Sequence, residues 1–348
     1  MLTFPASSIL LAAALAGGVA YVRLERVRRP AWRIAGRILL LGAIWASPLL
    51  TSGPGPVQLA LGLIVAFLGI RAASLAERDR RSRQPAPTAG ALARELLTPR
   101  ALLVERAEPV RRPAWRVARG GLGMAACAAL LVLGDRLEIW RWSRYADDLM
   151  VFAEVAIGAT GLHDALVGVA ALGFKRHIRG LLDRPALSTS LSQFWGRRWN
   201  RLVQADLDRG FFRPFARRGG GRAGTMAAFG ASGIMHAVAV LDAADLPLTA
   251  GPAARVMGFF LLHGVLVLGE QAVRARRHRS GHEEPPGRAG AAGRHAPASR
   301  ASLLGRRVMT LTVFALLSPL LLDPFARVTH VHGRHLGPQN FSEKPTVP

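Results

Sequence analysis

The sequence predicts an all-α protein that spans a membrane about eight times. Half of its 348 residues are hydrophobic, and its mean hydropathy is positive. Several apolar runs approach the roughly 20 residues that an α-helix needs to cross the hydrocarbon core of a bilayer. The predicted spans are approximately residues 2–22, 38–50, 57–72, 122–133, 149–174, 223–241, 253–273 and 308–322.

The basic residues support this division of the chain, because they are concentrated in alternate loops. Four loops contain 6, 11, 12 and 9 Lys and Arg residues, and they comprise residues 23–37, 72–119, 174–222 and 274–307. The loops between them contain three such residues or none. Since cytoplasmic loops are enriched in Lys and Arg, we predict an integral, multi-pass protein whose basic loops are cytoplasmic and whose two termini are non-cytoplasmic.

The net charge of +24 has two interpretations. A strongly basic chain is typical of nucleic-acid-binding proteins, but basic residues also orient membrane segments. The long apolar runs favour the second interpretation, so we expect membrane lipids and no nucleic acid as partners. The single cysteine, Cys127, excludes an intrachain disulfide and indicates no cysteine-ligated metal site.

One short segment occurs twice. The sequence Arg-Arg-Pro-Ala-Trp-Arg occupies residues 28–33 and 111–116, each time just before a predicted span. It is either part of a duplicated helix unit or a recurrent interfacial anchor, with Trp at the level of the lipid headgroups and Arg at the phosphates. We favour the anchor.

A basic segment with two tryptophans is the best functional clue in the sequence. Residues 188–200 read Ser-Thr-Ser-Leu-Ser-Gln-Phe-Trp-Gly-Arg-Arg-Trp-Asn. Apolar residues spaced by three and four across residues 191–215 predict an amphipathic helix that lies in the cytoplasmic interface. That interpretation leaves Asn200 unexplained, and an amide can hold a carbonyl oxygen during acyl transfer. Arg197 and Arg198 are suited to a nucleotide phosphate.

A histidine inside a predicted span is the second clue. His236 lies in the apolar run 223–241, where an ionisable side chain is costly and usually functional. Imidazole and carboxylate are also metal ligands, so an alternative is a metal site made of His163, Asp164, His236 and His263. The paired i,i+4 histidines of a helical metal site are absent, and we predict no metal. Since the sequence has no Gly-x-Ser-x-Gly motif, a covalent acyl-enzyme is not indicated either.

At these residues the chain resembles the wax synthase branch of the membrane-bound O-acyltransferase superfamily. Two motifs carry the resemblance, Ser190-Leu-Ser-Gln-Phe-Trp-Gly-Arg-Arg-Trp-Asn200 and Ser232-Gly-Ile-Met-His236. Many members have an acidic residue after the histidine, whereas this chain has Ala237. The resemblance divides the chain into an N-terminal membrane region (1–148), a wax-synthase-like catalytic region (149–325) and a polar tail (326–348).

The resemblance implies transfer of a fatty acyl group from acyl-CoA to the hydroxyl of a long-chain alcohol or another lipid, with no cofactor besides that co-substrate. His236 would be the general base, and Asn200 would bind the carbonyl oxygen or orient the imidazole. The residues expected to contact substrate are Trp195, Arg197, Arg198, Trp199, Ser232 and His263. The alternative is a non-enzymatic lipid transporter or lipid-binding protein, in which the intramembrane histidines bind or gate.

Overall fold

The computed structural model describes residues 4–27, 29–47, 55–82, 87–98, 112–173, 181–243, 250–280 and 300–329. These residues form helices and connecting segments, and no strand occurs among them. Six helices in the described ranges are long and apolar enough to cross a membrane. The predicted all-α, multi-pass architecture is therefore confirmed.

The long helices follow the predicted spans closely. The six candidate spans belong to α3 (Gly55–Arg81), α5 (Pro113–Arg136), α7 (Arg144–Gly173), α10 (Arg213–Ala243), α11 (Ala250–Ser280) and α12 (Arg300–Thr329). The first two predicted spans correspond to α1 (Phe4–Arg23), of 20 residues, and α2 (Pro30–Ala46), of 17 residues. A total of eight crossings stays a prediction. The shorter helices are α4 (Ala89–Leu97), which the sequence did not predict, α6 (Ile139–Trp142), α8 (Leu191–Gln193) and α9 (Arg201–Leu207).

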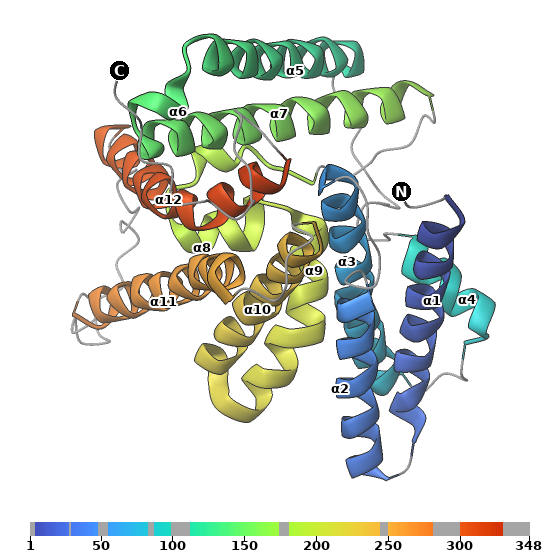
Figure 1. The fold of residues 1–348 in the computed structure, drawn as a ribbon. Coiled ribbons are helices and arrows are strands. Elements are labelled where there is room, and N and C mark those ends of the chain that lie inside the picture. Colours follow the sequence, from blue (N-terminus) through green and yellow to red (C-terminus); the bar gives the residue numbers. More distant parts are fainter. Residues whose placement is uncertain are drawn as a thin grey trace.

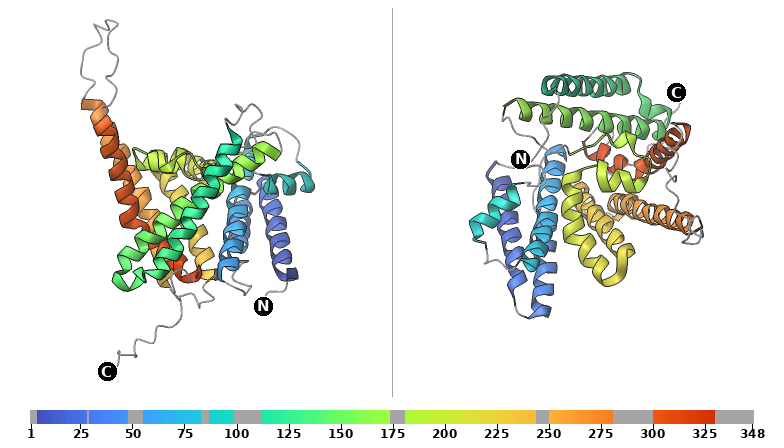
Figure 2. Two further views of the ribbon diagram at one scale, coloured as in Figure 1. Left: turned by 90° about the horizontal axis from the view of Figure 1, so that it is seen from above. Right: turned by 180° about the vertical axis from the view of Figure 1, so that it is seen from behind.

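The helices pack as one bundle around two groups (Figure 1). In one group α1, α2 and α3 lie together, and α4 packs against α1 and α3. In the other, α5 and α7 run side by side, and α12 packs on α7. Between them, α10 contacts α3, and α11 contacts both α10 and α12. The right view of Figure 2 shows the green helices α5 and α7 running across the direction of the blue helices α1 to α3, so the two groups are inclined to each other.

Ion pairs join three of the basic segments at the ends of their helices. Arg26, after α1, binds Asp79 near the end of α3 at 3.2 Å. Arg217, in α10, binds Glu77 of α3 at 2.7 Å. These contacts place loops that the charge pattern assigns to one face of the membrane next to one another. They do not say which face that is, so the orientation of the termini stays a prediction.

The repeated Arg-Arg-Pro-Ala-Trp-Arg segment begins a helix at both of its positions. Pro30 and Pro113 are the first residues of α2 and α5, where the missing proline N–H is not needed for a helical hydrogen bond. Trp32 and Trp115 are 67% and 58% exposed on the protein surface. Outward-facing tryptophans next to arginine fit the predicted interfacial anchor.

The region 191–215 differs from the single amphipathic helix that its spacing predicts. It consists of α8, a π-helical turn η5 (Phe194–Arg198), α9 and a second π-helical turn η6 (Asp208–Phe212) that leads into α10. The helix breaks at Asn200, whose φ of 37° and ψ of 62° are left-handed. Asparagine tolerates this conformation better than most side chains, and here it begins α9 as the N-cap.

This segment packs alongside α3, with most of its side chains buried or half-buried. Asp206 of α9 accepts a hydrogen bond from Arg71 of α3 at 3.0 Å, with side chains 2% and 4% exposed. Phe211 stacks on Trp45 of α2 with ring centroids 6.3 Å apart. At Gly210 an added Cβ would lie 2.9 Å from a backbone nitrogen of α3, so the close contact requires glycine. The apolar face that the sequence assigned to lipid is thus covered by other helices.

A sharp reversal in α10 brings its second half back along α9. Gly219 and Gly220 are non-helical, and Gly220 has φ 76° and ψ 176°, a combination that essentially only glycine adopts. The yellow ribbon in Figure 1 makes a U-turn here. The second arm contains the predicted span 223–241, so His236 and Asn200 lie on two neighbouring antiparallel arms.

Helices from both sides of the proposed boundary at residue 148 pack together. The buried pair Arg71–Asp206 joins α3 to α9, and α3 also packs directly against α10. The limits 1–148, 149–325 and 326–348 remain predictions, and residues 330–348 of the tail lie outside the described residues.

Candidate functional site

Asn200 and His236 line the same cavity. The cavity has a volume of about 360 Å³ and lies between the two arms of the α9–α10 region, α11 and α12. Three of the other predicted site residues also line it, namely Trp195, Trp199 and Ser232. We call it the His236 cavity. The two motifs, 36 residues apart in the sequence, therefore meet at one place.

A hydrogen bond to the backbone fixes the His236 ring. Its Nδ1 lies 2.8 Å from the carbonyl oxygen of Ser232, one helical turn earlier. Because a carbonyl only accepts, Nδ1 carries the hydrogen, and in the neutral imidazole Nε2 keeps its lone pair. The ring also stacks on Phe260, with centroids 4.6 Å apart and planes at 29°. This arrangement leaves Nε2 as the group that can accept a proton.

Asn200 uses one half of its amide to begin a helix. Its Oδ1 accepts from the backbone N–H of Val203 at 3.4 Å, the usual bond of an N-cap. The Nδ2 group is then the half that remains for a ligand, and it can donate two hydrogen bonds. An amide donor at the edge of an apolar cavity is suited to a carbonyl oxygen on which negative charge develops.

The serines ahead of the tryptophans turn out to hold the backbone of the motif. Ser190 caps α8 by accepting from the N–H of Gln193 at 3.0 Å. Ser192 donates from its N–H and its hydroxyl to Glu270 of α11, at 3.0 and 3.3 Å. The same carboxylate binds Arg274. Glu270 therefore ties the motif to α11, a role that spacing alone could not reveal because 78 residues separate it from Ser192.

The two arginines of the motif have different surroundings, and neither lines the His236 cavity. Arg198 donates from Nη1 to the carbonyl oxygens of Asp183 and Arg184, at 2.9 and 3.3 Å. Arg197 is exposed. Of the pair, Arg197 is thus the side chain presented outward, and Arg198 is engaged with the segment 181–187.

His263 lies next to the cavity but does not line it. It is fully buried, and its Nδ1 lies 2.9 Å from the carbonyl oxygen of Phe259. Its ring contacts Phe259, Phe314 and Trp195 at centroid distances of 4.3, 4.7 and 5.5 Å. All three of these aromatic side chains line the cavity, so they lie between it and His263. The predicted role of His263 as a direct substrate contact gains no support from this position.

The four residues considered for a metal site are not brought together. His163 and Asp164 line a second cavity, His236 lines the first, and His263 lines neither. In the part of the chain that the structure describes, no group of three His, Cys, Asp or Glu side chains is placed to hold a metal ion.

Together the fold and the site define a multi-pass membrane protein with a polar pair enclosed in an apolar bundle. Residues 178–262 match the model of the membrane bound O-acyl transferase family, and this range contains both Asn200 and His236. The matches below confirm the predicted resemblance to the wax synthase branch of that superfamily.

Several curated plant proteins are similar to this chain. The probable long-chain-alcohol O-fatty-acyltransferase 1 of Arabidopsis thaliana is 34% identical over 177 residues, 46% of this chain and 48% of the relative. The long-chain-alcohol O-fatty-acyltransferase of Simmondsia chinensis is 34% identical over 118 residues, 32% of each chain. The acyl-CoA–sterol O-acyltransferase 1 of Arabidopsis thaliana is 35% identical over 99 residues, 26% of this chain and 28% of the relative. The chain thus spans less than half the length of these relatives.

Proposed function

We propose that this protein is a membrane-bound O-acyltransferase that moves a fatty acyl group from acyl-CoA to the hydroxyl of a long-chain alcohol or another lipid. The observation that carries the proposal is the shared cavity of Asn200 and His236. Both residues lie in the range that matches the acyltransferase family, and the names of the relatives give the reaction type.

The proposed reaction is a direct transfer with His236 as general base. Nε2 of His236 takes the proton of the alcohol as its oxygen attacks the thioester carbonyl carbon. The C–S bond then breaks, and the imidazolium returns the proton to the CoA thiolate, which leaves an ester and free CoA. Asn200 donates from Nδ2 to the oxyanion that forms. Proton transfer of this kind typically contributes about 10²- to 10⁴-fold to the rate.

The surroundings of His236 suit a base that has no acidic residue next to it in the sequence. Where many members of the superfamily have an acidic residue, the small Ala237 is buried in the core. The Ser232 carbonyl oxygen, at 2.8 Å, takes over the task of fixing the tautomer. Because a charged imidazole is costly in an apolar bundle, the neutral form is the one available to accept a proton. Phe229 and Phe260 give part of the cavity apolar walls.

The direct test is ester synthesis by the purified protein. The chain is reconstituted in phosphatidylcholine nanodiscs and given palmitoyl-CoA with either hexadecanol or a sterol, because relatives of both kinds are similar to it. We expect ester and free CoA in equal amounts, measured by mass spectrometry and thiol release. Binding of these lipids without ester formation would instead support the alternative of a transporter or lipid-binding protein.

We also propose that the basic loops face the cytoplasm and that both termini lie on the other side. The support is the charge pattern, together with the contacts that join three of these loops at one face. Reporter tags inserted at residues 85 and 285, which lie outside the described residues, are expected to be cytoplasmic, and tags at the termini non-cytoplasmic. A cytoplasmic C-terminus would contradict the count of eight crossings.

A further inference from the structure

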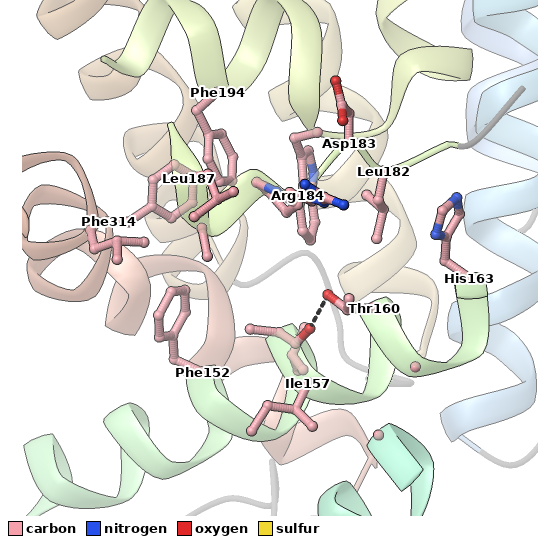
Figure 3. Close-up of a pocket in the computed structure, with 18 of the residues that line it drawn as sticks. Phe152, Ile157, Thr160, His163, Leu182, Asp183, Arg184, Leu187, Phe194 and Phe314 are labelled. Carbon is pink, nitrogen blue, oxygen red and sulfur yellow. Dashed lines mark hydrogen bonds between the residues drawn. The ribbon is translucent and has the colours of Figure 1, made fainter. Parts of the chain in front are cut away.

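A second and larger cavity lies beside the His236 cavity. Its volume is about 700 Å³, and most of its lining comes from α5, α7, α12 and the segment 182–187 (Figure 3). Trp199, Phe259, Phe314 and Leu321 line both cavities, so these side chains lie between the two. We call this space the α7 cavity.

The α7 cavity has an apolar end and a polar end. Figure 3 shows Phe152, Phe194 and Phe314 at one end and His163 at the other, with Arg184 between them. Arg116 and Arg119 of α5 also line it. A cavity with one apolar and one polar end fits a molecule that has an apolar chain and a polar head, because the chain then contacts apolar side chains and the head contacts polar ones.

The polar side chains of the lining, from Arg184 in the middle to His163 at one end, carry more positive than negative charge. Asp164 accepts from Nε of Arg119 at 2.8 Å, so these two charges offset each other. Asp183 is paired with Arg201 in the same way. The remaining arginines of the lining, Arg116 and Arg184, form no ion pair within the described residues. The head group that this end favours is therefore an anion.

A buried imidazole nitrogen at the polar end lacks a partner. His163 is 7% exposed, and its Nδ1 lies 3.5 Å from a carboxylate oxygen of Asp164. Its Nε2 is buried and makes no hydrogen bond to any residue that the structure describes. Because Nδ1 directs its hydrogen at that carboxylate, Nε2 is a hydrogen-bond acceptor. Leaving it unsatisfied is costly, which indicates that a donor group of a ligand, such as a hydroxyl, binds there.

We propose that the α7 cavity binds an anionic amphiphile with a single chain. Its anionic group lies at Arg116 and Arg184, a hydroxyl of its head donates to Nε2 of His163, and its chain lies against Phe152 and Phe314. Two sources share this chemistry. One is a coenzyme A thioester from the aqueous phase, and the other is a lysophospholipid from the membrane. The site does not depend on acyl transfer, and only the first source would connect it to the proposed function.

The test measures binding in nanodiscs of neutral phosphatidylcholine, with the full chain carrying His236→Ala so that no thioester is consumed. The probes are palmitoyl-CoA and palmitoyl lysophosphatidate, with free CoA as a head without a chain and hexadecanol as a chain without an anion. We expect the two amphiphiles, or one of them, to bind at least about tenfold more tightly than CoA and hexadecanol. The amphiphile that binds identifies the source.

Variants locate the binding. Ala156→Phe fills the cavity from α7 and is expected to weaken binding by about tenfold or more. Leu162→Phe is the matched control, since it adds a ring to the same helix at a side chain that is 48% exposed. Arg116→Gln with Arg184→Gln is expected to weaken binding by about tenfold and to reduce its salt dependence. Arg136→Gln, at the far end of α5 and exposed, is its control.

Two results would overturn the proposal. One is unchanged amphiphile binding in the double arginine variant, which keeps the packing intact and so decides the matter even if Ala156→Phe fails to fold. The other is binding of hexadecanol as tight as that of palmitoyl-CoA. Since neither result involves ester formation, both are distinguishable from a failure of the proposed acyltransferase activity.

Discussion

Two histidines on neighbouring helices make the same backbone hydrogen bond in different surroundings. His236 of α10 and His263 of α11 each have Nδ1 within 2.8 to 2.9 Å of the carbonyl oxygen four residues earlier. His236 lines a cavity that Asn200 shares, whereas His263 is fully buried among aromatic rings and lines neither cavity. Burial inside the bundle is common to both. What distinguishes the candidate base is access of its second nitrogen to a space that a substrate can enter.

The largest effect is expected at His236. His236→Ala is predicted to lower kcat for ester synthesis by at least about 10²-fold, because the proton acceptor is lost. The variant is expected to remain folded and inserted, since a small neutral residue is cheaper in a membrane helix than imidazole. Steady-state kinetics and a melting curve measure the two properties separately. Near-normal ester synthesis would refute the mechanism.

The second-largest loss of activity is expected at Asn200. Asn200→Ala is predicted to cost about 2.7 to 4 kcal/mol of transition-state stabilisation if its amide meets the oxyanion, and less if it only orients the imidazole. Because both residues act on one transition state, the double variant with His236→Ala is expected to lose much less than the product of the single losses. If the loss in the double variant equals the product of the two single losses, the two residues do not act together on one transition state. Asn200→Asp is a useful control, because it keeps the N-cap of α9 and removes the amide donor.

A smaller loss of activity is expected on substitution of Arg197 or Arg198. Arg197 is exposed, whereas Arg198 binds the carbonyl oxygens of residues 183 and 184. Arg197→Ala is predicted to raise KM for acyl-CoA by about tenfold, with little change in KM for the alcohol or in melting temperature. Arg198→Ala is predicted to raise the same KM and to lower the melting temperature as well. Equal effects on both substrates would indicate loss of folding instead of loss of a phosphate contact.

The smallest effect on activity is expected at His263. His263→Phe keeps a ring of similar size in the aromatic cluster and removes a buried nitrogen without a described partner, so its stability is expected to change by less than about 1.5 kcal/mol. The kcat for ester synthesis is predicted to stay close to that of the unchanged protein. A loss of kcat as large as that of His236→Ala would contradict this difference between the two histidines and would indicate that His263 also takes part in the reaction.

The sequence alone predicted the long apolar helices and the two residues, Asn200 and His236, that line one cavity in the structure. A membrane helix is a local property, since about 20 consecutive apolar residues must satisfy their own backbone hydrogen bonds in hydrocarbon. For the same reason His236 could be identified from its position in an apolar run. Asn200 was recognisable because a helix in the interface gives no reason for an amide at that position.

Only the tertiary structure decided where the motif segment lies. Spacing within residues 191–215 shows an apolar face, but it cannot tell whether lipid or protein covers that face. The answer depends on partners far away in the sequence, such as Arg71, which binds Asp206 across 135 residues. The α7 cavity is equally non-local, because side chains from α5, α7, α11, α12 and the segment 182–199 line it. Packing between distant helices determines both features, and this packing cannot be predicted from periodicity in one stretch of sequence.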